Sequence, residues 1–258
     1  MYKKEVTDFV VRENQMLSDM YSLLKLTPAN GADLPPMSPG QFVQVKVPDC
    51  ADVFIRRPIS INFVDYEKKE LWLLVRRAGK GTAVLCDIKA GHVLNLILPL
   101  GNGFSMPASV DSRILLVGGG VGVAPLLYFG KVLKETGYKP EFLLGARTKQ
   151  DLLQIDLFEA IGTVYASTED GSYGETGLVT QHSVLSTGIN QIFCCGPAPM
   201  MKAVANVSRA IGAECEVSLE NMMACGVGAC LCCVEKTVKG NVCVCTEGPV
   251  FNINKLTW

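Results

Sequence analysis

Six of the eleven cysteines in this 258-residue sequence lie in one short segment, between Cys225 and Cys245. Thiolates are ligands for iron–sulfur clusters and for zinc, so this segment predicts a metal site. Four of the thiols follow the spacing C-x4-C-x2-C-x11-C, namely Cys225, Cys230, Cys233 and Cys245. This spacing is that of plant-type [2Fe–2S] ligation. Cys232 and Cys243 fall outside it, and we expect them not to be ligands.

Glycines within this segment favour a loop that wraps closely around a cluster. Gly226 and Gly228 permit the φ values and the close approach that aim backbone N–H groups at the sulfurs. A structural zinc site usually takes paired C-x2-C knuckles, of which the segment has one. A Rieske centre would need two nearby histidines, and His92 and His182 are far away in the sequence. We therefore predict a [2Fe–2S] cluster, with zinc or unligated thiols as the alternatives.

A second candidate site is a glycine run that follows a short apolar segment. Residues 114–117 predict a buried strand, the glycines follow at 118–122, and a helix is expected from Pro125 to Lys134. Backbone N–H groups and the helix dipole can hold a pyrophosphate at such a turn. The run does not fit G-x-G-x-x-G. A tight turn is therefore the alternative to nucleotide binding by Gly119, Gly120 and Gly122.

The third candidate is the tetrapeptide Arg57-Pro58-Ile59-Ser60. Pro58 fixes the backbone, and the guanidinium of Arg57 offers a fork for a phosphate. The hydroxyl of Ser60 could reach a ring nitrogen of a flavin. Taken alone, this pattern is better explained by a surface strand with solvated arginines.

The elements around these sites change character near residue 106. Upstream, β-rich runs punctuated by Pro and Gly predict a small antiparallel barrel with one short helix at Thr82–Asp87; the runs are 41–47, 59–64, 71–75 and 93–98. Downstream, strands at 141–144, 163–167 and 191–194 alternate with helices at 156–161 and 199–211, which predicts a parallel sheet covered on both faces. We expect an antiparallel barrel domain over residues 1–105, an α/β domain over 106–215 and a small cysteine module over 216–258.

Composition and charge exclude several classes of protein. A net charge of −1 argues against a broad nucleic-acid footprint. The sequence begins without an apolar signal segment, and no apolar run approaches the roughly 20 residues of a membrane helix. We therefore expect a cytoplasmic protein without a membrane span. Its odd cysteine count argues against a disulfide framework, and we interpret Cys50, Cys86 and Cys215 as small buried hydrophobic side chains.

Taken together, these segments resemble the ferredoxin-reductase superfamily, which combines an R-x-x-S barrel for FAD with a GGG-type loop and a later C-G-P. Here those motifs are residues 57–60, residues 118–126 and Cys195-Gly196-Pro197. More closely, the chain is similar to the electron-transfer subunits of bacterial dihydroorotate dehydrogenase B. The supporting stretches are 99–104, 170–174, 223–230 and 247–251, in the same order along nearly the whole chain.

This resemblance implies three cofactors: FAD, a [2Fe–2S] cluster and NAD. It implies FAD contacts at Arg57, Pro58, Ile59, Ser60, Leu74, Val75, Arg76, Gly81 and Thr82, and the four cluster ligands given above. The implied partner is an FMN-containing catalytic subunit, with two copies of each chain. Electrons from dihydroorotate would pass through that FMN, the cluster and FAD to NAD⁺, in pyrimidine biosynthesis. No side chain of this chain is implied to be a general acid or base.

Two other functions stay open on the sequence alone. One is the small subunit of an NADH-dependent ferredoxin:NADP oxidoreductase or sulfide dehydrogenase, but that pattern has Asp at the first cluster position, where this chain has Cys225. The other is a zinc-bearing interaction module without redox activity. The choice between NAD and NADP is open too, because Gly145-Ala146-Arg147 carries no acidic residue for a ribose.

Overall fold

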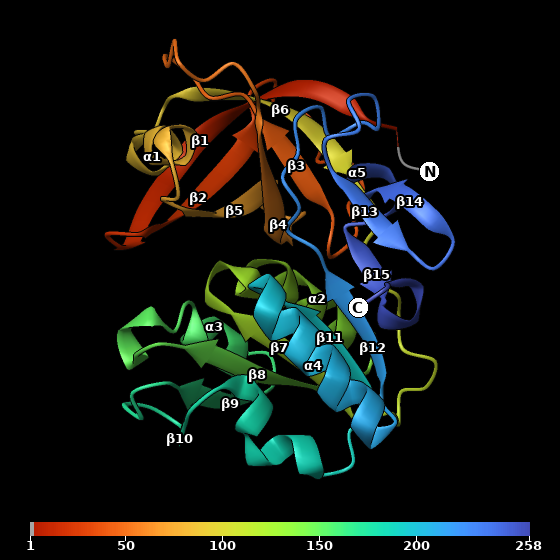
Figure 1. Ribbon diagram of the computed structural model, residues 1–258. Helices are drawn as coiled ribbons and strands as arrows, with labels where there is room; N and C mark the ends of the chain where they lie inside the picture. Colours follow the sequence, from red (N-terminus) through yellow and green to blue (C-terminus); the bar gives the residue numbers. More distant parts are fainter. Residues whose placement is uncertain (1–2) are drawn as a thin grey trace.

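The computed structural model describes residues 3–258, and its N-terminal part is a closed barrel (Figure 1). Its strands are ordered β1-β2-β5-β4-β3-β6, and every neighbouring pair is antiparallel. Their bounds are β1 Glu5–Ser18, β2 Tyr21–Pro28, β3 Phe42–Val45, β4 Arg57–Asp65, β5 Glu70–Arg76 and β6 Val93–Leu100. Helix α1 (Lys80–Asp87) lies where the short helix was expected. The predicted antiparallel barrel is therefore confirmed.

Strand alternation decides what each barrel residue faces. On β5, Leu73 and Val75 are fully buried in the cluster that fills the barrel. Leu74, between them, belongs instead to a cluster built by the α/β part of the chain. Arg76 has the same parity as Leu74 and is exposed. One face of β5 therefore completes the barrel core, and the other faces the second half of the molecule.

The second half is a seven-stranded sheet in the order β10-β9-β8-β7-β11-β12-β15. Its pairs are parallel except for the last, β12 with β15. The bounds are β7 Ile114–Gly119, β8 Pro140–Ala146, β9 Thr163–Thr168, β10 Glu175–Thr176, β11 Gln191–Cys195, β12 Glu214–Ser218 and β15 Val250–Asn252. The helices are α2 Ala124–Glu135, α3 Ile155–Glu159 and α4 Ala198–Ile211.

Both faces of this sheet are covered, as predicted. On β7, Ile114 and Leu116 pack in one cluster with α2 and α3, whereas Leu115 and Val117 pack in another with α4. Every residue of β7 is buried, which is typical of a central parallel strand. A short 3₁₀ turn, η1 (Gly120–Val123), joins β7 to α2 at the carboxyl edge of the sheet.

Beyond β12 the chain returns to the barrel before it rejoins the sheet. The cysteine loop comes first, followed by the hairpin β13 (Val234–Thr237) and β14 (Gly240–Cys243), the helix α5 (Val244–Glu247) and finally β15. In Figure 1 this C-terminal segment lies along one side of the molecule, beside the barrel above and the sheet below. The cysteine loop is therefore held by both halves of the fold.

Polar contacts fix the barrel against the start of α2. The side-chain amide of Asn62 on β4, which is fully buried, donates to Ala124 O at 3.0 Å. Asn62 and Gln154 also exchange two amide hydrogen bonds, each 3.0 Å long. Tyr128 on α2 donates to Met37 O at 3.1 Å. The turn that carries the glycine run is thus anchored to the barrel.

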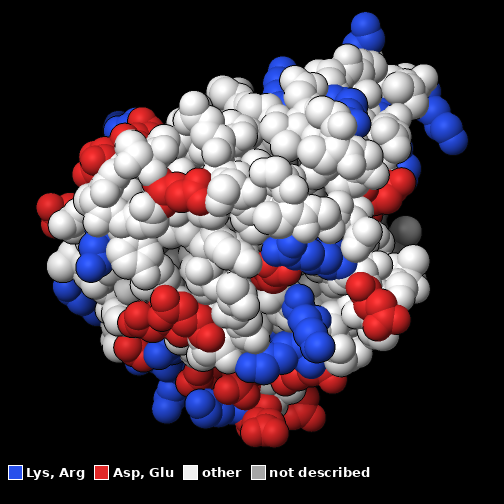
Figure 2. Space-filling view, turned by 90° about the horizontal axis from the view of Figure 1, so that it is seen from below, with Lys and Arg blue, Asp and Glu red and all other residues white. Residues whose placement is uncertain are grey.

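The cysteines outside the cysteine loop and the surface of the protein agree with most of the expectations. The structure describes all eleven cysteines, and none of them forms a disulfide. Cys86 and Cys215 are buried as expected, whereas Cys50 is only half-buried. Within residues 3–258, no helix has the length and apolar character needed to cross a membrane. Acidic and basic side chains are interspersed over the lower face (Figure 2).

Candidate functional site

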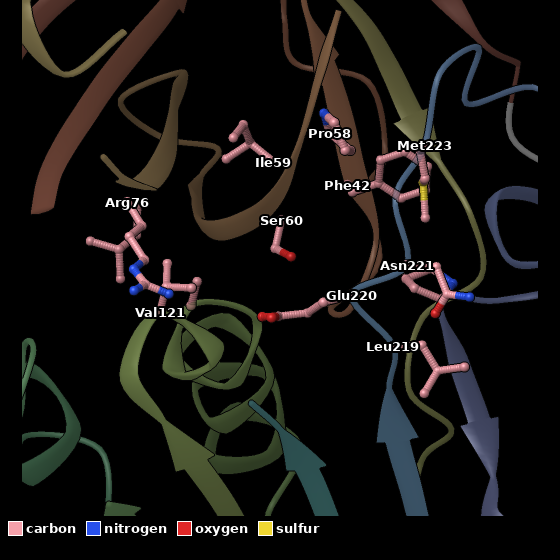
Figure 3. A pocket seen from close by; sticks show the side chains of 13 residues that line it. Phe42, Pro58, Ile59, Ser60, Arg76, Val121, Leu219, Glu220, Asn221 and Met223 are labelled. Carbon is pink, nitrogen blue, oxygen red and sulfur yellow. The ribbon is translucent and has the colours of Figure 1, made fainter. Parts of the chain in front are cut away.

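A cavity of about 220 Å³ lies between the barrel and the α/β part (Figure 3). Three of the residues expected to contact FAD, Pro58, Ile59 and Ser60, line it from β4, and two more, Leu74 and Arg76, line it from β5. The remaining lining residues come from outside the motif and are Phe42, Val121, Ala124, Leu219, Glu220, Asn221, Met223 and Pro249. The structure therefore brings the R-x-x-S strand and the β5 residues to one cavity. Val75 is the exception, because its side chain lies in the barrel core.

The remaining barrel residues of the prediction meet beside this cavity, at the start of α1. A Cβ added to Gly81 would lie 2.7 Å from Arg57 Nε, so the guanidinium of Arg57 lies directly against Gly81. The hydroxyl of Thr82 accepts hydrogen bonds from the backbone N–H groups of Ala78 and Gly79, at 2.9 and 3.1 Å. That hydroxyl therefore closes the turn before α1. Arg57 and the first turn of a helix together make a site suited to a phosphate.

A larger cavity, of about 690 Å³, lies at the carboxyl edge of the parallel sheet. This edge is where open α/β sheets bind their ligands. The residues that line this cavity come from the ends of β7, β8, β9 and β11, from the start of α4, from the segments after β8 and β10, and from the turn between β1 and β2. Apart from three that also line the first cavity, they are Met20, Tyr21, Gly119, Gly120, Gly145, Ala146, Arg147, Asp151, Ser167, Glu169, Gly177, Leu178, Val179, Thr180, Pro197, Pro199, Met200 and Ala203. Its size and position suit a nucleotide.

The three predicted glycines of this loop have different surroundings. Gly120 has φ +56°, and an added Cβ would meet only the Tyr21 hydroxyl, at 3.6 Å. Gly119 also lines the cavity, but its added Cβ would lie 2.5 Å from Met200 Sδ. An added Cβ at Gly122 would lie 2.5 Å from the backbone of Gly196. Gly122 thus allows the glycine loop to pack on the C-G-P turn, while Gly120 opens onto the cavity.

The two cavities share three lining residues: Arg76, Val121 and Glu220. Figure 3 shows the Glu220 side chain between the barrel and the α/β part, with its carboxylate below the Ser60 hydroxyl in this view. Crowding by protein atoms raises the pKa of the Glu220 carboxyl, and the charge of Arg76 partly offsets this shift. Glu220, Tyr21 and Met223 were not predicted as site residues. Glu220 and Met223 reach the cavities only because the chain returns to the barrel after β12, and Tyr21 does so through the β1–β2 hairpin. The shared wall is where groups bound in the two cavities would meet.

Beyond Met223 the chain enters the cysteine loop, whose four predicted ligands form two neighbouring pairs. Cys230 N–H donates to Cys225 Sγ, and Cys245 N–H donates to Cys233 Sγ, both at 3.4 Å. Cys233 and Cys245 are buried, Cys225 is half-buried and Cys230 is exposed. Within residues 3–258, no three side chains of Cys, His, Asp or Glu converge as they would on a single ion. Each iron of a binuclear cluster needs two protein thiolates, so an arrangement in pairs fits that group.

Backbone N–H groups point at the cysteine sulfurs, as the glycines predicted. Val227 N–H donates to Cys225 Sγ at 3.4 Å, and Gly228 N–H donates to Cys245 Sγ at 3.2 Å. Gly226 and Gly228 have φ of +71° and +85°. Burial would raise the pKa of Cys225, but the N–H donors outweigh it and lower that pKa to about 6. The loop thus stabilises a thiolate at Cys225, which is the form that binds iron.

The two remaining thiols of the segment differ in position. Cys232 is exposed and donates to Met222 O at 3.7 Å. Cys243 is half-buried near the predicted ligands, and burial together with the neighbouring Cys233 raises its pKa. The structure therefore sets Cys232 apart from the pairs and brings Cys243 close to them.

Comparison with known families matches two parts of the chain. Residues 220–257 match a family described as the iron–sulfur cluster binding domain of dihydroorotate dehydrogenase B, and residues 116–206 match an oxidoreductase NAD-binding domain. The cysteine loop and the glycine loop fall within these two matches.

Solved structures share the fold. A chain from the structure of an NADH-dependent reduced ferredoxin–NADP oxidoreductase aligns with a TM-score of 0.84 and 27% identity, over 97% of this chain and 90% of that one. The flavohaem-like FAD/NAD-binding domain of a nitric oxide dioxygenase from Vibrio cholerae aligns with a TM-score of 0.69 and 21% identity, over 82% and 98%.

Two similar relatives are both described as the electron transfer subunit of dihydroorotate dehydrogenase B (NAD(+)). The protein from Shouchella clausii is 37% identical over 99% of each chain. The one from Geobacillus kaustophilus is 40% identical over 84% of this chain and 86% of its own. With this identity over nearly its whole length, the chain belongs to the family of electron-transfer subunits of NAD⁺-dependent dihydroorotate dehydrogenase B.

Proposed function

We propose that this chain carries electrons between the catalytic subunit of a dihydroorotate dehydrogenase and NAD⁺. The observation that carries this proposal is the order of three sites along one path. The nucleotide cavity shares Arg76, Val121 and Glu220 with the barrel cavity, and the barrel cavity is lined by Asn221 and Met223, which lead into the cysteine loop. The proposed division of the chain is residues 1–105 for FAD, 106–215 for the nucleotide and 216–258 for the cluster. When bound, FAD exchanges a hydride with nicotinamide and single electrons with a [2Fe–2S] cluster.

In the barrel, Arg57 and the backbone of Gly81 and Thr82 are the proposed holders of the FAD pyrophosphate. The side chains of Pro58, Ile59, Ser60, Leu74 and Arg76 would surround the flavin ring, and Val75 would contribute only its main chain. Ser60, which lines the barrel cavity, would orient the flavin ring. Glu220, which lines both cavities, would orient the flavin ring and the nicotinamide of NAD⁺ relative to each other. The role of the protein is to position these groups and to exclude water between them.

In the α/β part, Gly119 and Gly120 are the proposed contacts of the dinucleotide pyrophosphate, and Gly122 supports them through its packing on Gly196. Glu169 and Asp151 line the cavity along with Arg147. We propose these carboxylates as acceptors for ribose hydroxyls. The sequence alone did not locate them, because Asp151 lies four residues beyond Arg147, in η2 (Lys149–Asp151), and Glu169 follows β9 instead of β8.

For the cluster, the contacts favour Cys225 with Cys230 on one iron and Cys233 with Cys245 on the other. Backbone N–H donors to these sulfurs would stabilise the added electron, because hydrogen bonds to sulfur tune the reduction potential of such clusters. A zinc site is the competing occupant, and metal analysis with EPR spectroscopy distinguishes the two.

The proposed partner is an FMN-containing catalytic subunit, in an assembly with two copies of each chain. From Asn221 to Val234 the chain carries no charged residue, and Met222 and Leu231 on that loop are 84% and 65% exposed. Apolar side chains this exposed, around a redox centre, suit a protein interface. We propose that the catalytic subunit docks on this loop.

A second candidate function is electron transfer to or from ferredoxin. It is favoured by the similarity, with a TM-score of 0.84, to a chain of the NADH-dependent reduced ferredoxin–NADP oxidoreductase. Co-purification separates the candidates. An FMN protein that oxidises dihydroorotate supports the first, and a ferredoxin-dependent partner supports the second.

The barrel prediction concerns Arg57 and Gly81. Arg57→Ala removes the fork that would bind phosphate, and charged hydrogen bonds of this kind are worth roughly 1.5–3 kcal/mol. We expect FAD affinity, measured by flavin titration of the apoprotein, to fall about tenfold or more. Gly81→Ala should have a similar effect by displacing the Arg57 side chain, whereas Gly79→Ala meets open space and should bind FAD normally. Wild-type affinity in Arg57→Ala would remove this residue from the site.

The nucleotide prediction concerns Gly120. Asn tolerates the positive φ at this position, so Gly120→Asn adds a side chain to the cavity with little backbone strain. The KM for NADH in a dye-reduction assay should rise roughly tenfold, or about 1.4 kcal/mol, with an unchanged flavin spectrum. Gly137→Asn, at another positive φ with open space around it, is the control and should leave KM unchanged. Loss of FAD together with wild-type NADH affinity, measured by direct binding titration, would reverse the assignment of the two cavities.

The cluster prediction compares two adjacent thiols. Cys233→Ala removes one proposed ligand, so iron content and the reduced-cluster EPR signal should be lost. NADH should still reduce the flavin and the flavin should still reduce a dye, because those sites are built by other elements. Cys232→Ala should retain both the iron and the EPR signal. If Cys233→Ala lost dye reduction to the same extent as the cluster signal, the site would hold a structural metal instead.

The partner prediction uses Leu231, a non-glycine residue with φ +57°. Asp tolerates this conformation, so Leu231→Asp should fold while it places a charge in the proposed interface. We expect NAD⁺-dependent dihydroorotate oxidation in the reconstituted complex to fall about tenfold or more, with unchanged dye reduction by the isolated chain. Val238→Asp, at a similarly exposed position on the β13–β14 turn, should have little effect. If Leu231→Asp assembled with the catalytic subunit as well as Val238→Asp does, the interface would lie elsewhere.

A further inference from the structure

Gln44 is a fully buried polar side chain of the barrel that contacts the cysteine loop. It lies on β3, and its Nε2 donates to Ala224 O at 3.4 Å across 180 residues of sequence. A Cβ added to Gly226 would lie 2.6 Å from Gln44 Cγ and 2.8 Å from Nε2. The side chain therefore touches the residue before and the residue after Cys225.

The same amide has an unpaired end. Gln44 Oε1 is buried and has no hydrogen-bond partner among the described residues. A buried carbonyl oxygen without a hydrogen-bond partner destabilises the fold, so a merely structural core position would favour an apolar residue. Gln41, just before β3, is a contrast: its Oε1 accepts from Ser38 N–H at 2.7 Å, and its Nε2 donates to Gly101 O at 2.9 Å.

Gln44 also lies between the barrel cavity and the loop. Gln44 on β3 pairs with Pro58 on β4, and Pro58 lines the barrel cavity. Phe42, two residues before Gln44 on β3, lines the same cavity. The backbone around it is held rigidly, since Arg56 Nη1 donates to Gln44 O at 3.3 Å and to Asn95 O at 2.8 Å. An anchor on this strand thus relates the position of Cys225 to that of the flavin cavity.

We infer that Gln44 is a positioning residue, which seats the Cys225 segment on the barrel and sets the electrostatic surroundings of the cluster there. This inference rests on the proposed function, because it assumes a cluster on Cys225, Cys230, Cys233 and Cys245. The amide of Gln44 fixes the loop through Ala224, and it contacts the backbone on both sides of the proposed ligand Cys225. Reduction potentials of such clusters respond to nearby charge and hydrogen bonding, so the side chain acts on the potential as well as on the fold.

The test is an EPR-monitored redox titration of the purified holoprotein, without its partner. Gln44→Glu should shift the cluster potential to more negative values, because a carboxylate beside the cluster opposes the added electron. Gln44→Leu should also shift the potential and broaden the EPR signal, because the loop loses its anchor. Gln41→Leu removes a buried amide that does not touch the loop, and it should leave both readouts unchanged even where it lowers stability.

The outcomes separate the inference from the proposed function. Wild-type potential and line shape in both Gln44 variants would overturn the inference. Where Gln44→Leu fails to fold, Gln44→Glu and Gln44→Asn, whose shorter amide cannot reach Ala224, decide it by the same titration. Absence of any reduced-cluster signal in the wild-type holoprotein would overturn the proposed function instead.

Discussion

The contact of the barrel with the start of α2 is the constraint on which the remaining sites depend. Leu74 leaves the barrel core to pack with the α/β part, and Asn62 reaches across to Ala124 and Gln154. These contacts fix the glycine turn opposite the R-x-x-S strand. Without them, the two cavities would not share a wall at Arg76, Val121 and Glu220. Buried amide pairs of this kind are also costly to leave half-made, which favours a single arrangement of the two parts.

The cysteine loop depends on the same arrangement from the other side. After β12 the chain passes through the wall of the barrel cavity and only then reaches Cys225. Gln44 holds the loop on the barrel, and β15 returns the chain to the sheet beside β12. Each half of the fold therefore contributes to the placement of the cluster. The cysteine module has little hydrophobic material of its own, and its buried residues join the core of the α/β part.

Much of the fold could be predicted from local patterns. The apolar run at 114–117 and its glycines predicted β7 and the turn after it, and the β-rich runs upstream predicted the antiparallel barrel. The positive φ at Gly226 and Gly228 was predicted as well, because a loop that wraps a cluster needs it. These features are set by neighbours in the sequence, so the sequence is enough to find them.

What the sequence could not provide is set by contacts between distant segments. Glu220, Tyr21 and Gln44 carry no local signal, and each acquires its role only when strands far apart in the chain meet. Parity along β5 likewise decides that Leu74 and Arg76 line the cavity while Val75 does not. At Gly122, a residue that looked like a phosphate contact packs on the backbone of Gly196.

We expect electrons to pass within this one chain from the nucleotide cavity to the cysteine loop. Anaerobic mixing of the purified holoprotein with NADH can follow this transfer, by absorbance for the flavin and by rapid freezing and EPR spectroscopy for the cluster. The flavin absorbance should bleach first and the reduced [2Fe–2S] signal should then grow, without any partner present. Bleaching of the flavin with no cluster signal at any time would show that the chain does not connect the two sites.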